Sequence, residues 1–255
     1  SLNYNGINIE STFITDNKSV NKTFIKSIFI RVLCWLKINN TNSIQFKSYL
    51  SSLERKMSHP KYVNIGSKQV NAGSAYRGNC NNIVIWRNEE IKKVLIHEMG
   101  HCLKLEFGPP FIDHSQESNY NNLEQHIIFI FNIPINTIIR LYEAYNEIWS
   151  LIANTMFCAI ENQIDNTKYD TIQQTFLYFL QNEISFSLFQ SAKIIKYFGF
   201  HDFNDFFSLK GFTKENRNKS KYKQSSSVLS YYIIKSALLY NINIFMELCF
   251  RYNKD

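Results

Sequence analysis

Residues 97–101 of this 255-residue chain read His-Glu-Met-Gly-His, inside an apolar stripe with helical spacing. The stripe recurs every three or four positions and consists of Ile91, Val94, Leu95, Met99 and Leu103. On a helix, positions i and i+4 share a face, so His97 and His101 can direct their imidazoles at one point. The pattern requires a helix that is buried on one side and carries both histidines at the edge of that side.

The same five residues predict a metal site with hydrolytic chemistry. In an H-E-x-x-H helix the two histidines bind Zn²⁺, and the glutamate beside the first acts as general base on the metal-bound water. We therefore expect His97 and His101 to be zinc ligands and Glu98 to be the catalytic base. The alternative interpretation is a helix whose two histidines contact solvent or neighbouring side chains without a metal.

The residues before the motif favour the metal site. Asn88 is a candidate helix cap, and the short β-branched run Asn82–Arg87 predicts a strand. A second strand is expected within Val70–Arg77, with a hairpin turn at Gly78–Asn81. This order of strand, turn, strand and H-E-x-x-H helix resembles the zincin peptidases. We expect an extended substrate to pair with the strand around Gly73–Arg77, because an edge strand beside the zinc has unpaired N–H and C=O groups.

The rest of the chain predicts a mainly helical α+β protein with a small sheet. The expected helices are Ser19–Asn39, Ser43–Met57, Leu123–Phe131, Thr137–Ile160 after a cap at Asn136, Tyr169–Phe198 and Ser226–Tyr252. A polar loop is expected at Asp113–Asn122. We expect a catalytic region at 1–165 and a helical region at 166–255, either separate or packed as one domain.

A catalytic zinc needs a third protein ligand, and the sequence favours Glu147. The metzincin signature is excluded, because Lys104 and Phe107 stand where it requires glycine and histidine. Asn146-Glu-Ile-Trp-Ser150 instead resembles the N-E-x-x-S element of gluzincins, in which a downstream helix supplies a glutamate ligand. A carboxylate on such an apolar helix would be costly without a metal. The alternatives that remain open are Glu143 one turn earlier, Asp113 or His114 in the polar loop, and Glu124 or His126.

Arg140 is a candidate stabiliser of the oxyanion that develops during hydrolysis. Some gluzincins place a tyrosine two helical turns before the glutamate ligand, and Arg140 takes that position here, about 20° from the direction of Glu147 on an ideal helix. A surface arginine is an equally good interpretation.

The composition of the chain limits which other classes of protein it can belong to. The formal charge is +7, but its one dense cluster, Lys210–Lys223, is polar and is interpreted as a solvated loop rather than a nucleic-acid site. We expect no membrane span, because no stretch of eighteen uncharged apolar residues occurs, and no signal peptide is visible. Five widely spaced cysteines predict a reducing compartment and buried thiols, with Cys102 as a packing residue.

The H-E-M-G-H motif in a chain rich in Asn, Ile and Lys resembles the RavK family of Legionella effector proteases. The resemblance implies a zinc endopeptidase delivered by a bacterium into the host cytosol, with actin as its protein substrate. Only His97, Glu98 and His101 are carried over from that family. The competing hypothesis is a catalytically inactive zincin-like module that binds a host protein or polyanion through its basic surface. The intact Glu98 favours the enzyme, since a structural zinc would not require it.

Overall fold

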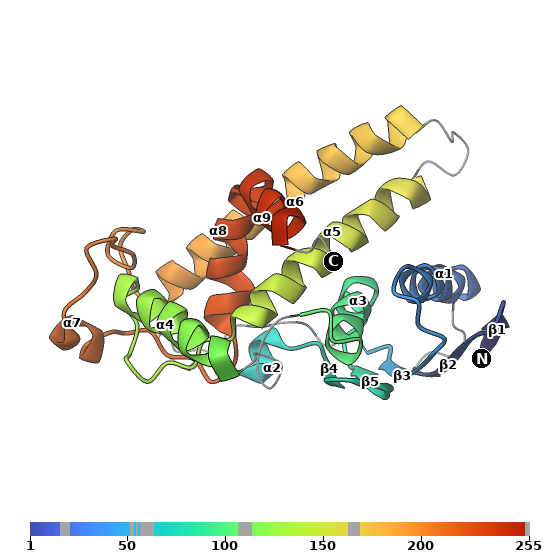
Figure 1. Cartoon of the computed structure of the whole chain (residues 1–255), viewed down its shortest axis with the longest axis horizontal. Helices are drawn as coiled ribbons and strands as arrows, with labels where there is room; N and C mark the ends of the chain where they lie inside the picture. The colour runs from blue at the N-terminus through green and yellow to red at the C-terminus, as the bar shows by residue number, and fades with distance from the viewer. Residues whose placement is uncertain are drawn as a thin grey trace. The chain divides into compact units, whose positions relative to one another are not determined.

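The computed structural model describes residues 1–15, 21–51, 54, 56, 64–106, 114–162 and 169–252, and Figure 1 shows its elements. The protein is mixed α+β and mainly helical, as the sequence predicted. Its two compact units interleave along the chain. The first unit is Ser1–Arg55, Asn71–Glu106 and Trp149–Leu177, and the second is Lys56–Val70, Phe107–Ile148 and Tyr178–Asp255. The units therefore do not divide at the single predicted boundary near residue 165, because two long helices each contribute to both.

The first unit contains a five-stranded sheet in the order β1-β2-β3-β5-β4. In chain order the strands are Leu2–Tyr4, Ile7–Ile14, Ser43–Tyr49, Gly73–Tyr76 and Asn79–Ile85. The three inner strands run parallel, and β1 and β4 pair antiparallel at the two edges. β4 is an edge strand, as predicted for this segment, so the backbone groups along its outer side are not paired within the sheet.

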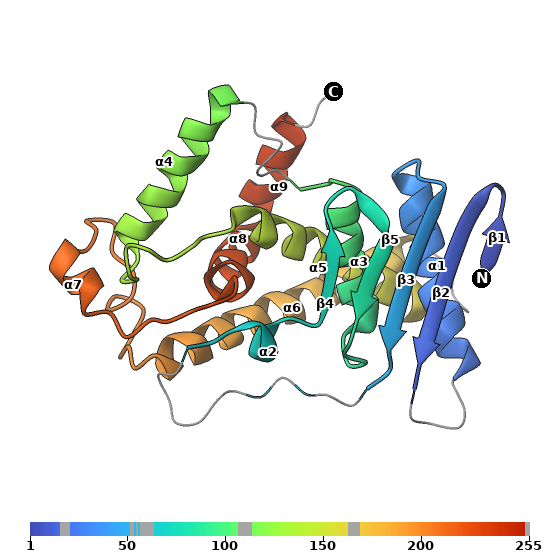
Figure 2. The same cartoon turned by 90° about the horizontal axis from the view of Figure 1, so that it is seen from below.

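Two helices cover one face of this sheet. Figure 2 shows α1 (Lys22–Ile38) and α3 (Ile91–Cys102) behind the strands, and Figure 1 shows both on the same side. Ile9, Leu36, Ile85 and Met99 are completely buried, and they come from strands and helices alike. The predicted apolar stripe of the motif helix therefore packs against the sheet. The helix begins at Ile91 without a side-chain cap, so Asn88 does not have the predicted capping role.

Three strands of this unit differ from the sequence prediction. The segment Ser43–Met57 was predicted as a helix, but Ser43–Tyr49 forms β3, in which every second residue is buried. This alternation is the period of a half-buried strand, and the helix prediction for this segment is therefore wrong. The β1–β2 hairpin was not predicted either. Its two-residue turn is made by Asn5 and Gly6, which both have positive φ, of 48° and 80°.

A buried arginine joins α1 to the second half of α5 (Leu141–Asn162). The Arg31 guanidinium is 2% exposed and donates to both carboxylate oxygens of Glu161 at 2.9 Å. Lys92, on α3, lies 3.2 Å from the same carboxylate. One carboxylate therefore ties three helices of the first unit together.

The second unit is helical. It contains α2, α4, α7, η1, α8 and α9, together with the first half of α5 and most of α6. Their bounds are Ser67–Val70, His114–Ile130, Lys214–Asn218, Leu229–Ile234, Lys235–Tyr240, Ile242–Tyr252 and, for α6, Tyr169–Tyr197. An aromatic core holds them, with ring centroids of Phe198 and Tyr222 separated by 4.6 Å and those of Phe131 and Phe206 by 5.2 Å.

Helix boundaries in this unit differ from the predictions at four places. The expected polar loop is largely helical, because α4 already begins at His114. α5 begins at Leu141, so Asn136 does not cap it. The basic cluster contains the short helix α7, capped by Thr213. The expected final helix is broken into η1, α8 and α9, with a 90° bend before Ile242.

No single helix in the described part of the chain is long and apolar enough to cross a membrane. Only the bent pair Leu229–Tyr240 and Ile242–Arg251 meets that criterion, when its two halves are taken together.

The lowered pKa of the Glu161 carboxyl predicts that the protein loses stability in acid. Burial alone would raise its pKa, but hydrogen bonds from Arg31 and Ser27 outweigh burial and lower the pKa from 4.5 to about 2. Because the folded pKa is depressed, the stabilisation is present above pH 4.5 and is lost as pH falls toward 2. The side chain is 36% exposed, so solvent screening should limit the contribution to about 1–2 kcal/mol.

Unfolding free energies measured from neutral to acidic pH check this prediction. Glu161→Gln should destabilise the protein at pH 7 and flatten the decline below pH 4.5. Glu10→Gln, which removes an exposed carboxylate from β2, is the matched control. An acid response of Glu161→Gln identical to that of the control would show that the ion pair contributes nothing measurable.

Candidate metal centre

His97 and His101 converge as the motif predicts. Their Nε2 atoms are 3.1 Å apart, and their rings are nearly perpendicular. Two nitrogens bound to one tetrahedral zinc at about 2.0–2.1 Å would be separated by about 3.3 Å. His97 is buried and the His101 side chain is only 12% exposed, so both imidazoles lie in a largely water-excluded place. The helix therefore presents the pair with the spacing that a shared metal ion requires.

A carboxylate from α5 completes a possible ligand set. One ligand atom each from His97, His101 and Glu143 lie within 4.8 Å of one another, and this group could hold a metal ion. Glu143 also accepts a hydrogen bond at Oε2 from the Tyr231 hydroxyl, at 3.0 Å. Tyr231 lies in η1, a π-helix, which is a rare local geometry that is frequent at functional sites. The Tyr231 hydroxyl therefore contacts a member of this possible ligand group.

The chemistry of this donor set fits zinc. Two imidazole nitrogens and one carboxylate are a common ligand set of catalytic zinc, which keeps its fourth position for water or substrate. Calcium and magnesium prefer oxygen ligands throughout, so a set with two nitrogens does not suit them.

Glu147, the predicted third ligand, is not part of this group. It lies one helical turn after Glu143 and is 8% exposed. Asn146 and Ser150 of the same N-E-x-x-S element are also buried. The structure therefore groups Glu143, rather than Glu147, with the two histidines. Glu143 is one of the alternatives that the sequence left open, because residues four apart share a helix face.

Glu98 lies against the edge strand. A Cβ atom added to Gly73, the first residue of β4, would stand 2.8 Å from Oε1 of Glu98. The same added atom would stand 2.8 Å from both Ile85 and Val94. Glu98 itself is 6% exposed. The strand and the glutamate can approach this closely only because residue 73 has no side chain.

Glu106 is a site residue that the sequence did not reveal. Its side chain is 1% exposed, and Oε1 lies 3.2 Å from Nδ1 of His101 and 3.3 Å from Nε of Arg77. A carboxylate at Nδ1 favours the tautomer whose proton is on that nitrogen, which leaves Nε2 with the lone pair that a metal needs. Arg77 also donates to the backbone oxygen of Glu106 at 2.7 Å. Glu106 therefore connects the end of β4 to the second histidine.

The end of α3 explains how Glu106 reaches His101. Lys104 adopts a left-handed conformation with φ of 60°, and Leu105 donates to the Gly100 oxygen at 2.9 Å. This hydrogen bond is typical of a helix that ends in a Schellman motif, where glycine is usual. The chain reverses there and returns Glu106 to the helix. A lysine at the turning position concealed this signal in the sequence.

The remaining predicted residues lie elsewhere. Arg140 lies immediately before α5, and its Nη1 donates to Ser227 Oγ at 3.4 Å, so its role as an oxyanion stabiliser stays a prediction. Asp113 lies outside the described residues, and His114 begins α4. His126 is exposed, with its ring 6.4 Å from that of Phe129. Among the described residues, only His97, His101 and Glu143 form a group of this kind.

The expectation of reduced, isolated cysteines is wrong for one pair. Cys80 in β5 and Cys102 at the end of α3 form a disulfide. Gly78 also donates to the backbone oxygen of His101 at 3.2 Å. The pair is 22 residues apart in sequence, and only the packing of the helix on the hairpin brings the two sulfurs together.

Comparison with known proteins gives little further information. No family model matches the chain, and no solved structure matches it. The chain is 26% identical over 207 residues to the uncharacterized protein R210 of Acanthamoeba polyphaga mimivirus. The match covers 80% of this chain and 47% of that protein, so the chain spans about half the length of the relative it matches. The site is therefore interpreted from its own geometry.

The choice between Glu143 and Glu147 can be tested by metal affinity. Because only Glu143 lies with both histidines, Glu143→Gln should weaken zinc binding by more than about 100-fold, the upper end for residues outside the ligand shell. Glu147→Gln removes the same charge one turn away on the same helix and should have a smaller effect. Competition with a chromogenic chelator measures both dissociation constants. Loss of zinc in Glu147→Gln with retention in Glu143→Gln would restore the original assignment.

Glu106 should act on the metal through His101. Glu106→Gln keeps the shape of the side chain but removes the charge at Nδ1, and should weaken zinc binding about 10-fold or more. The same chelator competition measures the change, and circular dichroism checks that helix content is kept. Glu10→Gln again serves as a matched loss of charge in the first unit. Identical zinc affinities for wild type and Glu106→Gln would exclude the positioning role.

Proposed function

We propose that this protein is a zinc-dependent endopeptidase of the zincin, gluzincin-like type. The observation that carries the proposal is the grouping of His97, His101 and Glu143, with ligand atoms within 4.8 Å, on a helix whose glutamate at 98 lies against an edge strand. The H-E-x-x-H pattern alone is short. Its placement beside an antiparallel edge strand and a third ligand from a later helix gives it the context that a zincin needs.

The proposed chemistry assigns separate roles to the chain's own residues. When bound, zinc polarises the scissile carbonyl and lowers the pKa of a water molecule at its open position. Glu98 accepts the proton of the attacking water and then donates it to the leaving amine. Its position, largely excluded from water beside β4, holds it at the strand where the peptide would lie. Glu106 and Tyr231 orient His101 and Glu143.

The proposed substrate is an extended segment of a protein. β4 is an edge strand, and a peptide that adds to it would pair its main chain with the outer side of Gly73–Tyr76. Main-chain pairing is largely independent of sequence, so specificity would come from other surfaces. By the resemblance to effector proteases, the proposed setting is a host cytosol reached by secretion from a bacterium, and actin is the first substrate to test.

An enzyme is favoured over an inactive binding module. A structural zinc usually has four protein ligands, whereas the group found among the described residues supplies three, the number that is usual for a catalytic zinc. A buried glutamate next to the first ligand costs stability and has no role in a purely structural site.

The deciding experiment compares wild type with Glu98→Gln. Glu98→Gln should keep stoichiometric zinc, because Glu98 is not in the ligand group, but should cleave at least about 100-fold more slowly. Zinc content is measured by mass spectrometry, and cleavage is measured on purified actin and on host-cell lysate. Glu89→Gln, an exposed residue just before α3, is the matched control and should cleave like wild type.

Three outcomes would contradict the proposal. Equal cleavage by Glu98→Gln and wild type would remove Glu98 from the chemistry. Zinc that remains bound in a His97→Ala, His101→Ala double variant would exclude the site itself. Zinc-loaded wild type that cleaves neither actin nor any lysate protein would favour the inactive binding module.

A further inference from the structure

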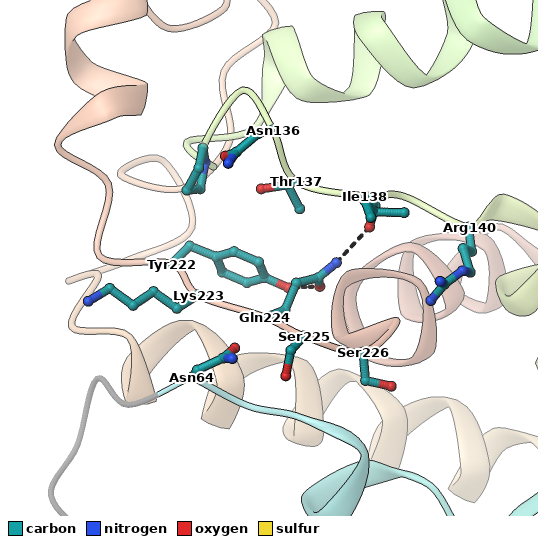
Figure 3. A pocket seen from close by; sticks show the side chains of 11 residues that line it. Asn64, Asn136, Thr137, Ile138, Arg140, Tyr222, Lys223, Gln224, Ser225 and Ser226 are labelled. Atoms are coloured by element: carbon teal, nitrogen blue, oxygen red, sulfur yellow. Dashed lines mark hydrogen bonds between the residues drawn. The ribbon is translucent and has the colours of Figure 1, made fainter.

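A pocket in the second unit has no part in the proposed peptidase chemistry. Its volume is about 390 Å³, and it lies where the segment 134–140 meets residues 222–226 and Asn64 (Figure 3). This volume falls within the range of roughly 300–1,000 Å³ that is usual for small-molecule sites.

Hydrogen bonds hold the walls of the pocket in place. Gln224 accepts at Oε1 from the Tyr222 hydroxyl at 2.6 Å and from the Leu229 N–H at 2.9 Å. Its side-chain nitrogen donates to the Ile138 oxygen at 2.8 Å, as the dashed line in Figure 3 shows. Ser225 donates its N–H to the Ile65 oxygen at 2.9 Å. The segments that line the pocket are therefore fixed before any ligand enters.

The lining of the pocket is basic and rich in hydrogen-bond donors. Arg140 and Lys223 are cations, and none of the described lining residues is acidic. Amide or hydroxyl groups come from both sides, including Asn64, Thr137 and Ser225. A pocket with this lining attracts anions and disfavours cations.

Arg140 is the residue that most requires a ligand. It is half-buried, and Figure 3 shows its side chain reaching toward the serine segment. Its one hydrogen bond to the described residues is the 3.4 Å contact with Ser227, and no carboxylate of those residues pairs with it. A guanidinium carries five N–H donors in a planar fork, and this contact uses only one of them. An arginine held in this way is prepared to bind a negative group.

The residues next to the pocket in sequence make the electrostatic potential there more positive. The basic cluster Lys210–Lys223 runs directly into it and contains six cations and one acid. Five of the six, all lysines, are exposed. Glu215, the acid of this cluster, forms an ion pair with Lys219. The positive charge that the peptidase proposal leaves unexplained is thus concentrated beside the pocket.

We propose that this pocket binds a phosphate-bearing ligand, with Arg140 as its principal contact. Arginine binds carboxylate and phosphate alike, but a phosphate offers at least three acceptor oxygens and up to two negative charges. The two cations and the neutral donors on both sides of the pocket can bind all of these oxygens. A single planar carboxylate would engage fewer of the donors. The proposal does not rest on the peptidase activity.

Isothermal titration calorimetry with inorganic pyrophosphate tests the proposal on the full chain. Wild type should bind, and Arg140→Gln should bind at least roughly ten-fold more weakly, since charge-assisted hydrogen bonds are lost. Arg140→Lys keeps the charge but not the fork and should also bind more weakly. It provides the test if the glutamine variant fails to fold. Lys214→Gln removes an exposed cation of the same basic cluster outside the pocket lining and should bind nearly as wild type does.

Two further arms separate the pocket from other anion sites. The His97→Ala, His101→Ala double variant should bind pyrophosphate like wild type, which excludes binding through a metal at those histidines. Succinate should bind more weakly than pyrophosphate. The proposal is overturned if pyrophosphate does not bind, if Arg140→Gln and Lys214→Gln are weakened equally, if the double variant loses binding, or if succinate binds as tightly.

Discussion

The close packing of α3 on the β4–β5 hairpin is the contact on which the candidate metal centre depends. At one end of the hairpin, Gly73 lets the strand approach so closely that an added Cβ would stand 2.8 Å from the Glu98 carboxylate. At the other end, the Cys80–Cys102 disulfide and a hydrogen bond to the His101 oxygen hold the last turn of the helix. Because both ends are fixed, the helix cannot slide along the strand. The histidines and the glutamate between these ends therefore keep their positions relative to the edge of the sheet.

This packing places carboxylates where water is scarce, which lowers stability unless each one is compensated. Glu106 is compensated by Arg77 and His101 at 3.2–3.3 Å. Replacing such a buried ionic group with apolar residues is often neutral or stabilising, so its presence is poorly explained by stability alone. It is well explained if the orientation of His101 matters. The first unit contains a contrasting case in Arg31 and Glu161, whose ion pair joins three helices and lies outside the metal group.

Helix α5 and the residue before it contribute to the basic pocket, to the metal group and to the Arg31–Glu161 ion pair. Arg140 immediately precedes it and lines the basic pocket, Glu143 lies in its first turn, and Glu161 near its end anchors it to α1. Tyr231 lies in η1, a π-helix, and its hydroxyl donates to the Glu143 carboxylate at 3.0 Å. The pocket and the metal group use different residues, so each can be changed by mutation without altering the other's side chains.

The sequence by itself determined the features that depend on local spacing. His97 and His101 share a face because they are four residues apart on one helix, and the strand–turn–strand segment before them follows from alternating residues and a glycine turn. It also placed the favoured third ligand, Glu147, and one of the alternatives, Glu143, on the same face of one helix, so it could not choose between these two. The tertiary structure groups Glu143 with both histidines, and it revealed Glu106 and the Cys80–Cys102 pair as well. Each of these depends on a turn or a packing contact that joins separate elements, and spacing along the chain does not encode such distances.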